Sequence, residues 1–323
     1  MIALRKWLKG VLRTTEGQKV VAIPGEMKNR EVLGMAVSPD GRWFATVGEQ
    51  SDVAVSDAAT GAHVRDFQGH TDTVWGVTWS PDGGTLATCS WDGTARLWDA
   101  ATGTVKQVLK SRWEVYGVAW SPDVQRLCTC GFGCNVEIWD VATGAVWPGL
   151  KGHTDSVMST VWEPHGRLVA TASCDLSLRL WEAYTVAAVR VLQGHPDWVR
   201  CIVWSPDGSM LAFSSQDKTA RVWDAAKGTV KLTLQGHTDW VMSVAWSPDG
   251  RLLATSAGQR ALKHLPAQEA VSSLTPTLAP HNRGIPLEAA VVVSFYSCAC
   301  TATLFCLLCV RPHRCGRCTA ECT

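Results

Sequence analysis

Short runs in which apolar and polar residues alternate recur along the chain, and turn signals separate them. The run VWGVTW (74–79) alternates and ends at Ser-Pro-Asp-Gly, and the runs TLATCS (85–90) and TARLWD (94–99) follow. Alternation with period two and an excess of β-branched and aromatic residues predict strands, while Pro, Gly and Asp predict tight turns. Residues 17–257 show no helical periodicity, so the pattern predicts an all-β chain.

The same four-strand segment returns along the chain at a nearly constant interval. Four copies open on Gly-His, two others are degraded, and the last copy stops matching after its second predicted strand. Four closing tryptophans lie 41 or 42 residues apart, a period that is typical of repeat architectures. The copies begin at Glu31, Gly69, Lys110, Gly152, Gly194 and Gly236, and the closing tryptophans are Trp98, Trp139, Trp181 and Trp223.

Four-stranded units at this period, with Gly-His and Trp-Asp pairs, resemble the WD-repeat (WD40-type) β-propeller family over roughly residues 17–259. The resemblance implies an all-β β-propeller of about six four-stranded blades, of which five are complete and the sixth is incomplete. Residues 1–16 are expected to form an N-terminal extension, and residues 260–323 a divergent, Cys-rich tail outside the propeller. For the sixth blade, ALKHL (261–265) is a candidate third strand, and GQKVVAIPG (17–25) is a candidate closing strand.

Three copies hold His, Ser, Asp and Trp at identical intervals. The resemblance implies that these side chains form a hydrogen-bonded chain inside each blade, with the Ser hydroxyl between the Trp indole and the His ring. A hydrolase triad also uses Ser, His and Asp, but catalysis needs such a set once, and here no Gly-x-Ser-x-Gly elbow exposes the Ser. We therefore expect a structural role. The sets are His70, Ser90, Asp92 and Trp98; His153, Ser173, Asp175 and Trp181; and His195, Ser215, Asp217 and Trp223.

Other copies lack parts of this set. The copy from Lys110 has Ser111, Gly131 and Gly133 in place of His, Ser and Asp, so its chain is not expected to form. The last copy keeps His237 and loses the Ser, Asp and Trp. A second tryptophan series ends the first strand of each copy and is expected to pack between blades; it comprises Trp79, Trp120, Trp162, Trp204 and Trp246.

Charge and composition argue against several classes of function. The 323 residues include 30 Lys plus Arg and 29 Asp plus Glu, and this balance argues against direct nucleic-acid binding. The sequence shows no metal triad, phosphate loop or unrepeated acid–base pair. We therefore expect no catalytic residue, no metal and no cofactor. An enzyme that uses the funnel at the ring centre is kept as an alternative.

The tail is different in composition from the repeats. Residues 289–310 carry no charge over 22 positions and are long enough for a membrane-spanning helix. Three interpretations stay open: a C-terminal anchor, a buried or partly ordered appendage, and a tail from a shifted reading frame or mis-joined exon. The N-terminus has no secretory signal, so we expect a cytoplasmic or nuclear protein, or a membrane-anchored one if residues 289–310 insert.

The expected function is a non-catalytic scaffold that binds another protein on the rim of the propeller. In the resembled family, the residues that flank the first-strand Val and the residue before the turn Asp face one rim. Here these positions are rich in residue types that dominate interface hot spots. The alternative that some of the indoles pack against neighbouring loops stays open. The candidate partner-binding residues are Trp75, Trp91, Tyr116, Phe132, Met158, Trp198, Arg200, Gln216, Trp240 and Met242.

Overall fold

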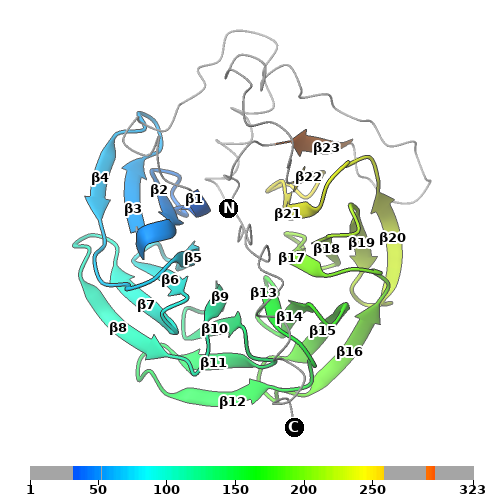
Figure 1. Ribbon diagram of the computed structural model, residues 1–323, viewed down its shortest axis with the longest axis horizontal. Helices are drawn as coiled ribbons and strands as arrows, with labels where there is room; N and C mark the ends of the chain where they lie inside the picture. Colours follow the sequence, from blue (N-terminus) through cyan, green and yellow to red (C-terminus); the bar gives the residue numbers. More distant parts are fainter. Residues whose placement is uncertain (1–31, 52, 258–288, 295–323) are drawn as a thin grey trace.

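The computed structural model describes residues 32–51, 53–257 and 289–294. Figure 1 shows six small sheets arranged as the blades of a propeller, with the first strand of each sheet nearest the axis and the last at the periphery. Five sheets have four strands, and every neighbouring pair in them is antiparallel. The predicted all-β propeller of about six blades is confirmed, although the sheets form an open arc and not a closed ring.

The strands follow the chain in order from one sheet to the next. The first sheet contains β1 (Val32–Val37), β2 (Trp43–Gly48), β3 (Val53–Asp57) and β4 (His63–Asp66), with a 3-10 turn, η2 (Glu49–Ser51), after β2. The second contains β5 (Val74–Trp79), β6 (Thr85–Ser90), β7 (Thr94–Asp99) and β8 (Val105–Lys110). The third contains β9 (Val115–Trp120), β10 (Arg126–Gly131), β11 (Val136–Asp140) and β12 (Val146–Leu150).

The fourth sheet contains β13 (Val157–Trp162), β14 (Leu168–Ser173), β15 (Ser177–Glu182) and β16 (Ala188–Gln193). The fifth contains β17 (Val199–Trp204), β18 (Met210–Ser215), β19 (Ala220–Asp224) and β20 (Thr229–Leu234). The sixth contains β21 (Val241–Trp246), β22 (Leu252–Ala257) and β23 (Ala289–Ser294).

The Ser-Pro-Asp-Gly segments close the first hairpin of a sheet, as the turn chemistry predicts. Between β5 and β6, the Ser80 hydroxyl donates to Asp82 and accepts from the backbone N–H of Thr85. Gly83 adopts φ +76°, a left-handed conformation that glycine reaches without strain. A side chain network and a glycine therefore fix the register of the first two strands.

The hydrophobic core lies between neighbouring sheets. The tryptophan that ends the first strand of the second to sixth sheets is buried and packs on the sheet before its own. Trp79 lies in one cluster with Val47 and Val55, and its Nε1 donates to the Ala36 carbonyl. Trp204 likewise packs on Ala172 and other residues of the fourth sheet. The predicted blade-to-blade role is confirmed for the whole series, namely Trp79, Trp120, Trp162, Trp204 and Trp246.

The sixth sheet takes its third strand from the tail. β23 pairs with β22 in parallel, with Leu252 opposite Ala289 and Ala257 opposite Ser294. The two segments that the sequence offered for this sheet, 17–25 and 261–265, lie outside the described residues. The first six residues of the apolar segment 289–310 are therefore a strand, and its remainder is outside the described residues. In the part of the chain that the structure describes, no helix is long and apolar enough to cross a membrane.

Candidate functional site

The repeated motif side chains meet in the interior of a sheet, around a threonine that the sequence analysis did not single out. In the second sheet, Trp98 Nε1 donates to Thr88 Oγ1 at 2.8 Å, and Thr88 Oγ1 lies 2.7 Å from His70 Nε2. His70 Nδ1 lies 2.7 Å from Asp92 Oδ2. The fourth sheet repeats this arrangement with Trp181, Thr171, His153 and Asp175.

The expectation that Ser90 joins the indole to the imidazole is therefore wrong. Ser90 Oγ instead donates to the Asp72 carbonyl and accepts from the Asp92 backbone N–H, so that it fixes the loops at the end of the strand. Ser173 and Ser215 make the corresponding contacts in their sheets. Thr88 lies two residues before Ser90 in β6, so the two side chains share one face of the strand. Thr88 is the one farther from the end of the strand, and there it lies beside the Trp98 indole. A threonine ten residues before the closing Trp was the signal available in the sequence.

Donor and acceptor requirements fix the proton positions along this chain of bonds. The indole N–H can only donate, so the Thr88 hydroxyl accepts from Trp98 and donates its own proton to His70 Nε2. His70 Nδ1 then carries the proton that is donated to Asp92, and the imidazole is neutral. Burial lowers the pKa of His70 although the Asp92 carboxylate beside it acts in the opposite direction. Burial alone would raise the pKa of Asp92, but hydrogen bonds from His70 and Thr94 hold it well below its usual range.

The stability of the protein is expected to fall when the pH is lowered from about 7.5 to about 5.5. Burial lowers the pKa values of His70, His195 and His237, so in this window the unfolded chain binds more protons than the folded one. This contribution is complete above the ordinary histidine pKa and is lost as the pH falls through it. The slope approaches about 1.4 kcal/mol per pH unit for each histidine that stays neutral when folded. Urea denaturation across the window measures it.

The control for this prediction is the exposed His165, whose replacement in His165→Gln is expected to leave the slope unchanged. His70→Gln is expected to reduce the slope. A slope that is equal in the wild type and in His70→Gln would contradict the assignment.

The fifth sheet has lost the central hydroxyl. Phe213 occupies the position of Thr88, and its ring packs edge-on against His195 with centroids 5.0 Å apart. His195 Nε2 and Trp223 Nε1 are buried without a hydrogen-bond partner, and only the contact of His195 Nδ1 with Asp217 remains. The prediction of a complete chain in this copy is therefore wrong, because the sequence interval does not show what stands at the threonine position.

The copies that lack part of the motif keep single hydrogen bonds of the Trp–Thr–His–Asp chain. In the third sheet, which lacks the His and Asp and therefore the complete chain, Trp139 Nε1 still donates to Thr129 Oγ1 at 2.8 Å. In the sixth, His237 Nε2 lies 2.8 Å from Thr255 Oγ1. Within the described residues, no three His, Cys, Asp or Glu side chains gather in a metal-binding arrangement.

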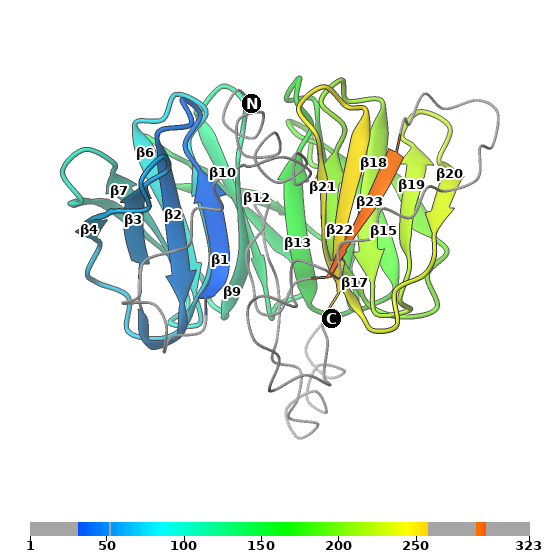
Figure 2. The same cartoon turned by 90° about the horizontal axis from the view of Figure 1, so that it is seen from above.

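The loops that precede the first strands and the turns between the second and third strands lie on one face of the propeller, which we call the rim face (Figure 2). Two clusters of aromatic side chains lie on the rim face, one at the second and third sheets and one at the fifth and sixth. In the first, Trp75 contacts Trp91 with ring centroids 4.8 Å apart and Tyr116 of the next sheet at 6.2 Å. Trp113 and Phe132 form a further pair at 6.2 Å.

The second group surrounds an arginine at the junction of the fifth and sixth sheets. The Arg200 guanidinium carbon lies 5.2 Å from the Trp198 ring centroid and 5.7 Å from that of Trp240. With its amide oriented to satisfy both side chains, Gln216 accepts from Arg200 Nε at 2.8 Å and also from Nη2. Arg200 is fully buried, so its charge is held by the two rings and this amide.

Burial divides the ten candidate partner-binding residues into two sets. The interpretation as contact residues is wrong for those that are buried, because neighbouring rings and loops cover them; these are Trp75, Met158, Arg200 and Gln216. They support the surface from beneath. The partly exposed residues, which remain candidates, are Trp91, Tyr116, Phe132, Trp198, Trp240 and Met242.

A relative that matches part of the chain is the U3 snoRNP-associated protein-like YAO of Arabidopsis thaliana. The match is 37% identical over 68 residues, which is 21% of this chain and 14% of that protein. The chain thus matches about a seventh of the length of this relative.

The model of one repeat family, described as WD domain, G-beta repeat, matches residues 61–99, 103–140, 147–182, 187–224 and 228–264. Each match begins at the outer strand of one sheet and, in the first four, ends with the third strand of the next sheet. One sequence repeat therefore ties two neighbouring blades together. The matches cover more than half of the chain and coincide with the observed sheets, so the chain belongs to the WD40-repeat family.

Proposed function

We propose that the chain is a non-catalytic scaffold that binds another protein on its rim face. Members of the WD40-repeat family generally mediate protein–protein interactions. The observation that carries the proposal is the set of partly exposed aromatic side chains on one face, held by buried partners beneath them. Trp and Tyr are enriched among interface hot spots because each brings a large contact area with few rotatable bonds.

The repeated His and Asp side chains support the non-catalytic part of the proposal. Both ring nitrogens of His70 are engaged inside the sheet, and the Ser90 hydroxyl bonds to backbone groups of Asp72 and Asp92. A hydroxyl nucleophile needs a histidine within hydrogen-bond reach to take its proton. Thr88 does reach His70, but its side chain is fully buried inside the sheet, where no substrate has access, so these residues support stability and not hydrolysis.

The class of partner follows from charge and from the relative. The nearly equal numbers of basic and acidic residues, 30 and 29, do not favour binding to a phosphate backbone, so a protein is the expected partner. The relative is by its name associated with the U3 snoRNP. We therefore propose a nuclear location for this chain and a partner among the protein components of a ribonucleoprotein particle.

Rim variants are expected to lose the partner without losing the fold. The full chain is first used to identify a partner from nuclear extract, and binding of the purified partner is then measured for Trp91→Ala, Trp198→Ala and Trp240→Ala. A hot-spot side chain is worth about 2 kcal/mol or more, so affinity should fall at least about thirtyfold for one of them. Melting temperatures are measured in parallel.

The matched control is Val189→Ala, on the exposed side of the outer strand β16. It should bind the partner as the wild type does. Unchanged affinity in all three rim variants, or loss of binding only where the melting temperature also falls, would contradict the proposal.

A further inference from the structure

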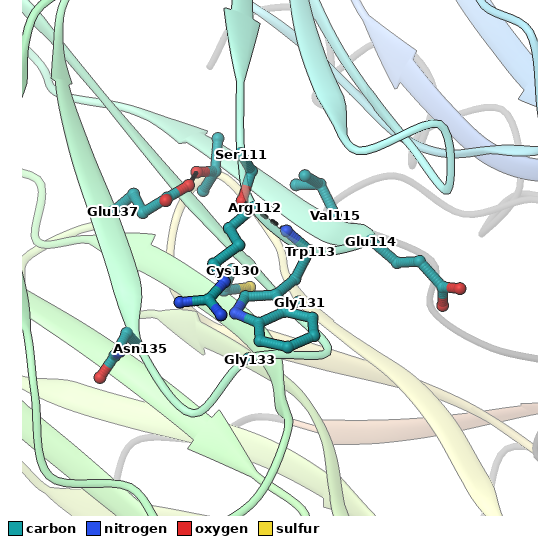
Figure 3. Close-up of a pocket in the computed structure, with 11 residues that line it drawn as sticks. Ser111, Arg112, Trp113, Glu114, Val115, Cys130, Gly131, Gly133, Asn135 and Glu137 are labelled. Carbon is teal, nitrogen blue, oxygen red and sulfur yellow. Dashed lines mark hydrogen bonds between the residues drawn. The ribbon is translucent and has the colours of Figure 1, made fainter. Parts of the chain in front are cut away.

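A cleft of about 570 Å³ opens in the third sheet, in the copy that lacks the motif His and Asp (Figure 3). In the second sheet the corresponding space holds His70 and Asp92. Ser111 and Gly133 stand at these positions in the third sheet, so neither the imidazole nor the carboxylate is present beside the cleft. The cleft is thus the site of the motif with its two polar side chains removed.

Glycines shape one wall of this cleft. A Cβ atom at Gly133 would lie 2.5 Å from Cδ1 of Trp113, so the absent side chain lets this indole stand against the backbone. A Cβ atom at Gly131 would collide with the Glu114 carbonyl oxygen. Both positions therefore require glycine as long as the loop before β9 keeps its close approach, and this approach places Trp113 at the cleft.

The opposite wall carries a reversed charge. Glu137 occupies the position at which the second, fourth and fifth sheets have Arg96, Arg179 and Arg221. Ser111 and Thr129 contribute hydroxyls to the Glu137 carboxylate, with Thr129 Oγ1 at 3.4 Å. Burial raises the pKa of Glu137, while the hydrogen bonds from Ser111 and Thr129 act in the opposite direction.

Two further charged side chains line the cleft. Glu114 carries a second carboxylate, which accepts from the Tyr116 hydroxyl at 3.3 Å. Arg112 is exposed, and its guanidinium carbon lies 5.2 Å from the centroid of the Trp113 ring. The ring therefore already accommodates a guanidinium supplied by the chain itself.

We propose that this cleft binds a basic side chain, arginine or lysine, that the partner protein inserts from the rim face. The Glu137 carboxylate pairs with the cation, the Trp113 ring packs against it, and the Ser111 and Thr129 hydroxyls accept its remaining N–H groups. This inference deepens the proposed function, since it states which residue type of the partner reaches the scaffold.

The test uses isolated probes, so that it is independent of any partner. The full chain is labelled with 5-fluorotryptophan, the Trp113 resonance is assigned from Trp113→Phe, and ¹⁹F spectra are recorded during titration with N-acetyl-arginine methylamide and N-acetyl-lysine methylamide. We expect a saturable shift of the Trp113 resonance with at least one of them. N-acetyl-glutamate methylamide is the control probe and should leave the resonance in place.

Three variants of the cleft and one control variant complete the experiment. Glu137→Gln should weaken the effective probe at least about tenfold, and Glu137→Arg, which restores the residue of the other sheets, should abolish the shift. Arg112→Ala should strengthen binding because it removes a competing cation. Glu182→Gln, at the end of β15, is the matched control and should bind as the wild type does.

Absence of a saturable shift with both basic probes would overturn the inference, and so would a shift of equal size in Glu137→Gln. Neither result bears on binding at the rim face, because the affinity of Trp91→Ala and Trp240→Ala for the partner protein is measured separately. If the rim variants lose partner binding and the basic probes do not shift the Trp113 resonance, the scaffold proposal stands and the proposal of a bound arginine or lysine fails.

Discussion

Thr88→Val is expected to lower the free energy of unfolding by about 2–4 kcal/mol. Valine keeps the shape of threonine and removes the hydroxyl that joins Trp98 Nε1 to His70 Nε2. Both nitrogens are buried, and an unpaired buried polar group costs about 1–3 kcal/mol. Urea denaturation monitored by tryptophan fluorescence measures the loss.

The other sheets supply a graded comparison for this prediction. Thr129→Val leaves the Trp139 donor unpaired and removes the long 3.4 Å hydrogen bond to Glu137, but no buried histidine loses a partner, so it should cost less than Thr88→Val. Thr233→Val, on the exposed side of the outer strand β20, should stay within about 0.5 kcal/mol of the wild type. Equal losses for Thr88→Val and Thr233→Val would contradict the observed chain of hydrogen bonds.

Trp204→Ala is expected to have the largest effect, a loss of about 3–5 kcal/mol in the free energy of unfolding. The indole lies between the fourth and fifth sheets, in one buried cluster with Ala172 and Leu180. Removing it loses both the buried apolar area and the packing of the two sheets against each other. Chemical denaturation measures the loss.

The control is Trp240→Ala, in which a partly exposed rim tryptophan is removed and a smaller loss is expected. If Trp204→Ala fails to fold, Trp204→Phe provides the measurement, since it keeps an aromatic ring and should retain part of the stability. A loss for Trp204→Ala no larger than that for Trp240→Ala would contradict the packing role.

The features that sequence reasoning predicted are those that one repeat determines by itself. Strands 74–79, 85–90 and 94–99 follow from alternation and from the turns that bound them, and these signals are local. The packing role of the second tryptophan series was predictable because its members stand at the same position in successive copies. Trp204, like the others, faces the sheet before its own. Local pattern and repetition were sufficient for both.

The features that it missed depend on contacts between distant segments. Trp75 is buried because Trp91 and Tyr116 cover it, and Tyr116 belongs to the next copy. β23 was not predicted because a short apolar run suits a strand or a helix equally, and its partner β22 lies more than thirty residues earlier. Thr88 was missed for another reason, since a threonine in a strand is ordinary and only the geometry shows its two bonds.

The cleft of the third sheet illustrates how loss of a motif can create a site. The sequence predicted that the hydrogen-bonded chain does not form there, because Ser111 and Gly133 replace the His and Asp. The structure shows that Gly131 and Gly133 instead let the loop that carries Trp113 approach the sheet closely. The same substitutions thus remove a stabilising pair and form a polar cleft on the rim face.

The measurement that tests the scaffold proposal most directly is site-specific photo-crosslinking in cells. A photoreactive amino acid replaces Trp91 or Trp240 on the rim face, or Val189 on the outer strand β16. The proposal predicts covalent adducts with the same partner protein from both rim positions and none from Val189. Adducts from Val189 with none from the rim positions would contradict it.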